Sequence, residues 1–184
     1  MRETTNSTMS SLRRFLCRTT LLSLLATASF TAAAAPFDTV RQDEAAPASA
    51  PAGFFQRYSQ NAQELIIKGL EFVGVRYRRG GTDPDTGLDC SGFVRTVFQE
   101  SLGMMLPRSA AQMSEVGEKI SANELRPGDL VFFNTMKRAF SHVGIYVGNN
   151  QFVHSPRPGG EVRVEDLRQS YWIQRYNGAR RVLE

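Results

Sequence analysis

The spacing of apolar residues changes at Pro127-Gly128, and this change limits the possible folds more than any other feature. Before this turn signal, apolar residues recur every three or four positions, as in amphipathic helices. The clearest such run is Phe93, Val94, Val97, Phe98 and Leu102. After it, short apolar and β-branched runs lie between turn residues and predict strands. Helices followed by an antiparallel sheet define an α+β fold.

Three helices are expected before the turn. The first is predicted to begin at a capping box formed by Asn61 and Glu64 and to end at Gly74. Its buried face is expected to consist of Ile66, Leu70 and Val73.

The second and third helices carry their own end signals. Asp89 is a natural N-cap and Gly103 a natural stop for the second, which places Cys90 in its first turn. Ser109 and Gln112 have capping-box spacing at the start of the third.

The predicted strands include one hairpin. The strands are expected at 129–133, 142–147, 151–154, 162–164 and 179–183. If His142 lies directly opposite His154, then Tyr146 faces Asn150 and residues 147–149 form a three-residue loop. That register brings the two imidazoles into contact on one face of the sheet, whereas a two-residue loop would separate them.

The N-terminal third differs from the rest. Arginines at 13, 14 and 18 precede an apolar stretch and then small residues, as in a secretory signal peptide, and we assign it to residues 1–35. The apolar run is too short for a membrane span. An Ala- and Pro-rich stretch, residues 36–57, is expected to be a flexible linker, followed by a catalytic domain at 58–184.

Loss of the leader changes the charge and the cysteine count. Residues 1–35 hold four Arg and one Glu, so the remainder is nearly neutral and the pI of 9.4 belongs mostly to the precursor. This disfavours nucleic-acid binding, although Arg76, Arg78 and Arg79 could meet an anionic substrate or be a solvated strand end. Cys17 would be removed, which leaves Cys90 as a lone thiol in an oxidising compartment.

A lone thiol and two histidines suggest nucleophilic chemistry. The helix start favours the thiolate of Cys90. His142 is the candidate base and His154 the group that orients it. The three residues match no compact zinc pattern, so neither a metal nor another cofactor is expected. Alternatives are a buried structural cysteine and histidines with no role.

Several sequence motifs resemble those of a known family. Residues 77–183 resemble the catalytic domain of the NlpC-type (NlpC and p-sixty) cell-wall cysteine peptidases, and especially the small Spr-type murein endopeptidases. The matching stations are Tyr77 with Gly80-Gly81, Asp89-Cys90-Ser91-Gly92-Phe93-Val94, Leu106-Pro107-Arg108-Ser109, Arg126-Pro127-Gly128-Asp129-Leu130-Val131-Phe132, His142-Val143-Gly144-Ile145-Tyr146-Val147 and Phe152-Val153-His154.

The resemblance implies a papain-like core and a Cys90, His142 and His154 catalytic set. It also implies that Tyr77 helps hold the oxyanion or substrate, and that Asp89 and Ser91 contact the stem peptide. Arg108 would be mainly structural. The sequence lacks the lipid-attachment cysteine of lipoprotein relatives, so no stable membrane anchor is expected.

The expected function is that of a periplasmic or secreted peptidoglycan endopeptidase. It would cut either the D-alanyl-diaminopimelate or the γ-D-glutamyl-diaminopimelate amide, and the resemblance favours the first. The alternatives are a non-catalytic peptidoglycan-binding module and an amidase or acyltransferase acting on another γ-glutamyl amide. The oligomeric state stays open.

Overall fold

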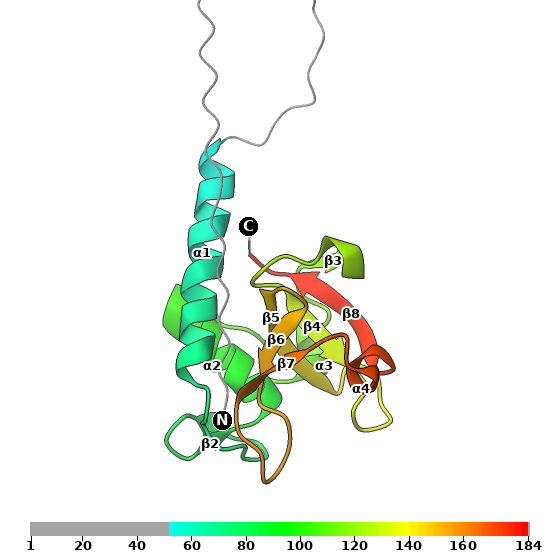
Figure 1. The fold of residues 1–184 in the computed structure, drawn as a ribbon. Helices are drawn as coiled ribbons and strands as arrows, with labels where there is room; N and C mark the ends of the chain where they lie inside the picture. The colour runs from blue at the N-terminus through cyan, green and yellow to red at the C-terminus, as the bar shows by residue number, and fades with distance from the viewer. Residues whose placement is uncertain (1–51, 184) are drawn as a thin grey trace, which may run out of the picture. The chain divides into compact units, whose positions relative to one another are not determined.

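The computed structural model describes residues 52–183 (Figure 1). Its α-helices are α1 (Ala52–Glu71), α2 (Cys90–Leu102), α3 (Ala110–Met113) and α4 (Ser170–Ile173), and a 3-10 turn spans Ala122–Glu124. Its strands are β1 (Thr82–Asp83), β2 (Gly87–Leu88), β3 (Glu118–Ile120), β4 (Leu130–Phe133), β5 (His142–Gly148), β6 (Gln151–His154), β7 (Arg163–Asp166) and β8 (Tyr176–Arg181). The predicted leader and most of the predicted linker lie outside the described residues.

The main sheet is antiparallel and is covered on both faces. Its strand order is β3-β8-β4-β5-β6-β7, and β1 and β2 form a separate pair. Figure 1 shows α1 and α2 on one side of this sheet and α4 on the other. Phe132, Val143 and Val153 pack toward α1 and α2, whereas Phe133 and Phe152 pack with the α4 side chains. The predicted α+β fold is confirmed, and β3 is a strand that the apolar pattern did not predict.

The start and the buried face of α1 both differ from the prediction. The helix begins at Ala52 and not at Asn61, so residues 52–57, expected in the linker, are helical. Leu70 and Val73, predicted to face the core, are 43% and 50% exposed.

A different set of α1 side chains is buried. The buried positions are Ala62, Leu65 and Gly69 of α1, and Phe72 directly after the helix ends at Glu71. A Cβ atom added at Gly69 would lie 3.4 Å from Val153 and 3.9 Å from both Phe93 and Val97. The small residues therefore let α1 approach α2 and the sheet closely, which decides the buried face. Because this helix has apolar residues on two faces, the spacing of apolar residues alone did not show which face is buried.

The ends of α2 and α3 follow the predicted signals. Asp89 caps α2 by accepting a hydrogen bond from Gly92 N, and Gly103 ends the helix with left-handed dihedrals. Ser109 and Gln112 form both hydrogen bonds of a capping box on α3. These local signals placed Cys90 correctly, as the first residue of α2.

The predicted hairpin register is wrong. Ile145 faces Val153 and Tyr146 faces Phe152, which puts His154 across from Gly144 and not from His142. The loop has two residues, Asn149 and Asn150, with φ values of 52° and 59°. Two neighbouring residues in the left-handed region match the two-residue loop that was the alternative in the sequence-based prediction.

A bulge explains why the histidines still share a face. The register shifts between Tyr146 and Gly148, so Val147 has no residue opposite it. Without this extra residue, Ile145 would lie opposite His154. Because side chains alternate along a strand, His142 and His154 would then point to opposite faces. The bulge returns both to the α4 face, one step apart on a diagonal.

None of the helices between residues 52 and 183 combines the length and the apolar character that a membrane span requires.

Candidate active site

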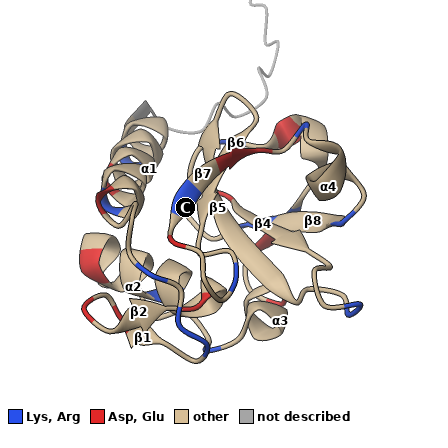
Figure 2. Ribbon diagram, turned by 60° about the horizontal axis from the view of Figure 1, so that its bottom comes forward, with Lys and Arg blue, Asp and Glu red and all other residues tan. Residues whose placement is uncertain are grey.

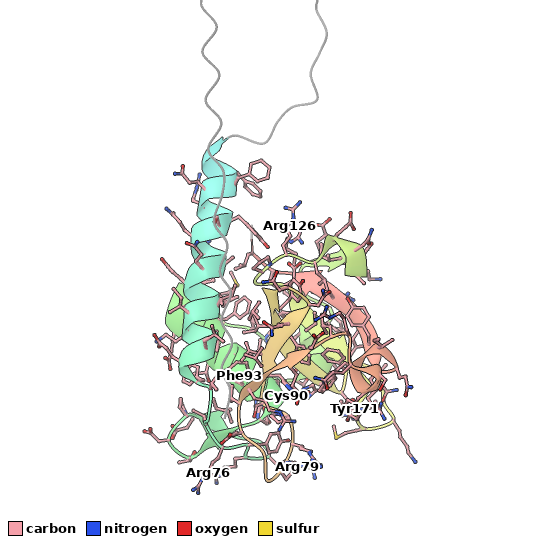
Figure 3. All side chains as sticks on the ribbon, viewed as in Figure 1. Arg76, Arg79, Cys90, Phe93, Arg126 and Tyr171 are labelled. Atoms are coloured by element: carbon pink, nitrogen blue, oxygen red, sulfur yellow. The ribbon has the colours of Figure 1, made fainter. Side chains whose placement is uncertain are left out.

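A cleft of about 550 Å³ opens where α2 and β5 begin. Cys90 is the first residue of α2 and His142 the first of β5, and both line the cleft. Tyr77 lines it as well, together with Tyr171 and Trp172 of α4. Figure 3 labels Cys90, at the start of α2, and Tyr171, to its right in this view. The cleft thus lies between the start of α2 and the sheet.

Burial controls the Cys90 thiol. Loss of solvation, and then the Asp89 charge, raise its pKa to about 11, although backbone hydrogen bonds, including one from Val143, act in the opposite direction. Desolvation thus opposes the thiolate that the helix start favours. The contact with Val143 also places the sulfur beside the residue that follows His142.

The two imidazoles are in direct contact. His142 Nε2 lies 2.7 Å from His154 Nδ1, with the rings 87° apart in plane. Both side chains are buried, and His142 also stacks on Trp172 at 5.8 Å between ring centroids. Burial lowers the pKa of both histidines, that of His142 most strongly. At neutral pH the site therefore holds a thiol and two neutral imidazoles.

Gly144 is required for this histidine contact. A Cβ atom at this position would lie 2.7 Å from a ring carbon of Phe152, 2.9 Å from the Val153 carbonyl oxygen and 3.1 Å from His154 Cβ. The bare backbone leaves room for the His154 side chain directly across the sheet. This gives a physical reason for the glycine in His142-Val143-Gly144-Ile145.

Glu165 lies behind the imidazoles and was not predicted as a site residue. Its Oε1 accepts a hydrogen bond from Arg163 Nε, and its Oε2 accepts one from Trp172 Nε1. The same Oε2 lies 3.7 Å from His154 Nε2. Its contact with His154 comes first among the causes that lower the pKa of Glu165 to about 2. The signal was the alternation in β7, which places 163 and 165 on the histidine face.

Asp89 and Ser91 are tied into a separate network. Asp89 accepts hydrogen bonds from the backbone of Gly80 and Gly92 and from the Ser91 hydroxyl. Arg108 donates to both Asp89 oxygens and to Ser91 Oγ. Neither residue lines the cleft. The capping role of Asp89 is confirmed, and a substrate contact by either residue stays a prediction.

Two groups near the thiol can donate hydrogen bonds to an oxyanion. Tyr77 lines the cleft, and burial raises the pKa of its hydroxyl, which therefore keeps its proton. The backbone N–H of Cys90 is at the first position of α2, where no helical acceptor exists. Among residues 52–183, no cluster of three or more His, Cys, Asp or Glu side chains could hold a metal ion.

A thiol at the start of a helix and an imidazole on an antiparallel sheet that line the same cleft are the arrangement of papain-like cysteine peptidases. The chain belongs to the NlpC/P60 family, whose model matches residues 74–181. The predicted family is thereby confirmed.

Three relatives illustrate the family match. Murein DD-endopeptidase MepS/murein LD-carboxypeptidase of Escherichia coli K12 is 48% identical over 119 residues, which are 65% of this chain and 62% of that protein. A probable endopeptidase NlpC homolog of Haemophilus influenzae is 47% identical, covering 71% and 72% of the two chains. The crystal structure of an NlpC/P60 family protein from Bacillus cereus has a TM-score of 0.63 and 36% identity, over 67% of this chain and 40% of that one.

Proposed function

We propose that this protein is a peptidoglycan endopeptidase that hydrolyses an amide bond in murein peptides. The observation that carries the proposal is the contact between His142 Nε2 and His154 Nδ1 beside the Cys90 thiol, at the wall of an open cleft. A nucleophile, a base and a group that orients the base are the parts that acyl transfer needs.

In the first half-reaction, Cys90 is the nucleophile. His142 Nε2 is occupied by His154, so Nδ1 is the nitrogen that accepts the thiol proton. The sulfur attacks the carbonyl carbon, and the Cys90 N–H and the Tyr77 hydroxyl donate hydrogen bonds to the oxyanion. The imidazolium then gives its proton to the leaving amine. The C–N bond breaks, and a thioester to Cys90 remains.

Water completes the cycle. His142 takes a proton from a water molecule while its oxygen attacks the thioester carbon. The C–S bond breaks, the proton passes to the sulfur, and a carboxylic acid product leaves. Because the thiol starts protonated, both halves depend on His142 as a base.

The surroundings of the cleft fit a murein peptide. Arg157 and Arg163 line it, and their guanidinium groups can pair with the free carboxylates of stem peptides. Figure 2 shows β7 basic at its first residue and acidic toward α4. The Escherichia coli relative is named a DD-endopeptidase, which supports the D-alanyl-diaminopimelate cross-link over the γ-D-glutamyl bond.

The relatives support action outside the cytoplasm. We assign the protein to the periplasm or the exterior, released from its leader at residues 1–35, with the catalytic domain beginning after the linker. The matched segment spans about 62% of the Escherichia coli relative, so the activity of that whole protein serves only as a guide.

Digestion of purified sacculi tests the proposal. We expect the wild-type protein to release muropeptides whose masses identify the bond cut, and Cys90→Ala to release none. Ser59→Ala, at an exposed position on α1, is the matched control and should cleave as the wild type does. Equal cleavage by Cys90→Ala would refute the proposal.

The other two functions predict different results. A binding module would bind sacculi without changing them, and its thiol would resist alkylation at neutral pH. An enzyme for another γ-glutamyl amide would leave sacculi intact but hydrolyse γ-glutamyl model amides in a Cys90-dependent reaction.

A further inference from the structure

Three side chains form a diagonal across the histidine face of the sheet. His154 on β6 lies opposite Arg163 on β7, and Phe152 lies opposite Glu165. Glu165 is therefore one step beyond His154, on the side away from His142. The diagonal His142, His154, Glu165 runs across β5, β6 and β7, and each residue is offset by two positions from the residue directly opposite the one before.

Resting on the function proposed above, we propose that Glu165 is a positioning residue that fixes where the protons of the two imidazoles lie. The carboxylate holds a proton on His154 Nε2, which in turn places a proton on His142 Nε2 and leaves His142 Nδ1 free to accept the thiol proton.

The direction follows from what each group can donate. A carboxylate only accepts, so the His154 nitrogen that faces it carries the N–H. Neutral His154 then has a bare Nδ1, and this nitrogen must accept at the 2.7 Å contact with His142 Nε2. His142 thus carries its proton on Nε2. In the reverse arrangement, His142 would hold its proton on Nδ1 and could not act as a base.

The geometry makes Glu165 the group able to set this order. His154 Nε2 is buried and has no hydrogen-bond partner among residues 52–183. Glu165 Oε2 lies 3.7 Å away, which is an ion-pair distance and longer than a hydrogen bond, so the carboxylate acts through its charge. In a buried site such an attraction is weakly screened.

The carboxylate is itself held in place. Arg163 Nε donates to one oxygen and Trp172 Nε1 to the other, and the Glu165 side chain is only 16% exposed. Trp172 also packs against His154 at 5.1 Å between ring centroids. These contacts prevent the carboxylate from turning to solvent.

Few other charges face the histidines. Glu165 and Arg163 of β7 act on His154, whereas His154 and Glu165 act on His142. Cys90 of α2 and Tyr77 complete the titratable groups of the nearby cleft wall, together with Arg157 and Tyr171. Glu165 is the carboxylate in this set.

Histidine NMR measures the proposed protons directly. The chain has only two histidines, so ¹⁵N-labelled histidine gives four ring nitrogens to assign. At neutral pH we expect both wild-type imidazoles to carry the proton on Nε2. Glu165→Gln, whose amide both donates and accepts, should give a mixture of tautomers. Glu165→Asp should keep the wild-type pattern.

Kinetics on a defined muropeptide provide a second readout. We expect Glu165→Gln to lower kcat by about tenfold to a hundredfold, part of what a general base contributes, with little change in KM. Because the carboxylate raises the pKa of both imidazoles, its loss should move the acid limb of kcat/KM to lower pH. A purely structural role would move neither the tautomers nor the acid limb.

Asp166→Asn is the matched control. It removes the same charge from the same strand, at a side chain that pairs with Arg168. It should change neither the tautomers nor the acid limb.

Three results would overturn the proposal: a wild-type His142 with its proton on Nδ1, an unchanged single tautomer in Glu165→Gln, or an equal response to Asp166→Asn. The wild-type spectrum decides even if Glu165→Gln does not fold. If the wild type cleaves no muropeptide, the proposed function fails, and the spectra still test Glu165 separately.

Discussion

The Asp89–Arg108 and Glu165–Arg163 ion pairs lie near the candidate active site, and they differ in what their carboxylates contact. Asp89, the N-cap of α2, accepts hydrogen bonds from two backbone N–H groups, from a hydroxyl, and from Nη1 and Nη2 of Arg108. Glu165 on β7 accepts one hydrogen bond on each oxygen, and one oxygen also faces buried His154.

The difference separates a carboxylate that holds the structure, Asp89, from one that acts on the imidazoles, Glu165. The hydrogen bonds of Asp89 fix where Cys90 lies, and its charge also contributes, after burial, to the raised pKa of the Cys90 thiol. The Glu165 charge is only partly neutralised and lies along the axis of the two imidazoles. Asp89 thus works mainly through the structure that it holds, whereas Glu165 faces a buried imidazole directly.

The largest effect that we expect from changing either carboxylate is the loss of stability in Asp89→Ala. Asp89→Ala removes the cap of α2 and leaves Arg108 without its partner, and we expect a loss of about 2–3 kcal/mol in the free energy of unfolding. Urea denaturation measures it. Asp85→Ala, at an exposed position in the preceding loop, should change stability by less than about 0.5 kcal/mol. Equal effects of the two variants would contradict the scaffold role.

The pH dependence of stability should sharpen the comparison. Burial lowers the pKa of both histidines, so the unfolded chain binds more protons below about pH 6.5 and stability should fall as pH drops through that range. Glu165, with a pKa of about 2 against an ordinary 4.5, stabilises the fold above about pH 4.5 and loses this effect as pH falls toward 2.

Unfolding free energies measured from pH 8 to pH 3 should show both declines. Glu165→Gln should weaken the lower decline, part of which belongs to Asp166. A stability profile that is flat between pH 7 and pH 5 would contradict the neutral, buried state of the histidines.

The smallest effect expected is that of Arg163→Gln. Its guanidinium lowers the pKa of His154, so removing it should shift the acid limb of kcat/KM to higher pH, opposite to Glu165→Gln. The Arg163 side chain is 43% exposed, and solvent screening should keep the change in kcat within about threefold. Arg168→Gln is the exposed control. A shift to lower pH would show that Arg163 acts mainly by holding Glu165.

Local chemistry made much of the fold predictable from the sequence. Caps at Asp89 and Ser109 and the left-handed stop at Gly103 act within one helical turn, so the residues alone announce them. The buried runs of β4 and β5 were likewise evident from their apolar residues. These same signals sufficed to place Cys90 and His142.

The features that the sequence analysis missed depend on distant partners. The buried face of α1 is chosen by how closely Gly69 can approach the sheet, and Glu165 becomes a site residue only through the pairing of β6 with β7. From the residues alone, any register other than direct pairing of His142 with His154 would be expected to separate the two imidazoles. That inference overlooked a diagonal contact, which long side chains on neighbouring strands can reach.

The unpaired Val147 decides whether His142 and His154 lie on the same face of the sheet. If one residue were gained or lost in the strands between His142 and His154, every later side chain of that strand would move to the other face of the sheet. A one-residue insertion there would therefore disturb the core and disconnect the base from its partner at the same time. Variation in chain length should be tolerated in the loop after β6, and within β5 and β6 only in steps of two.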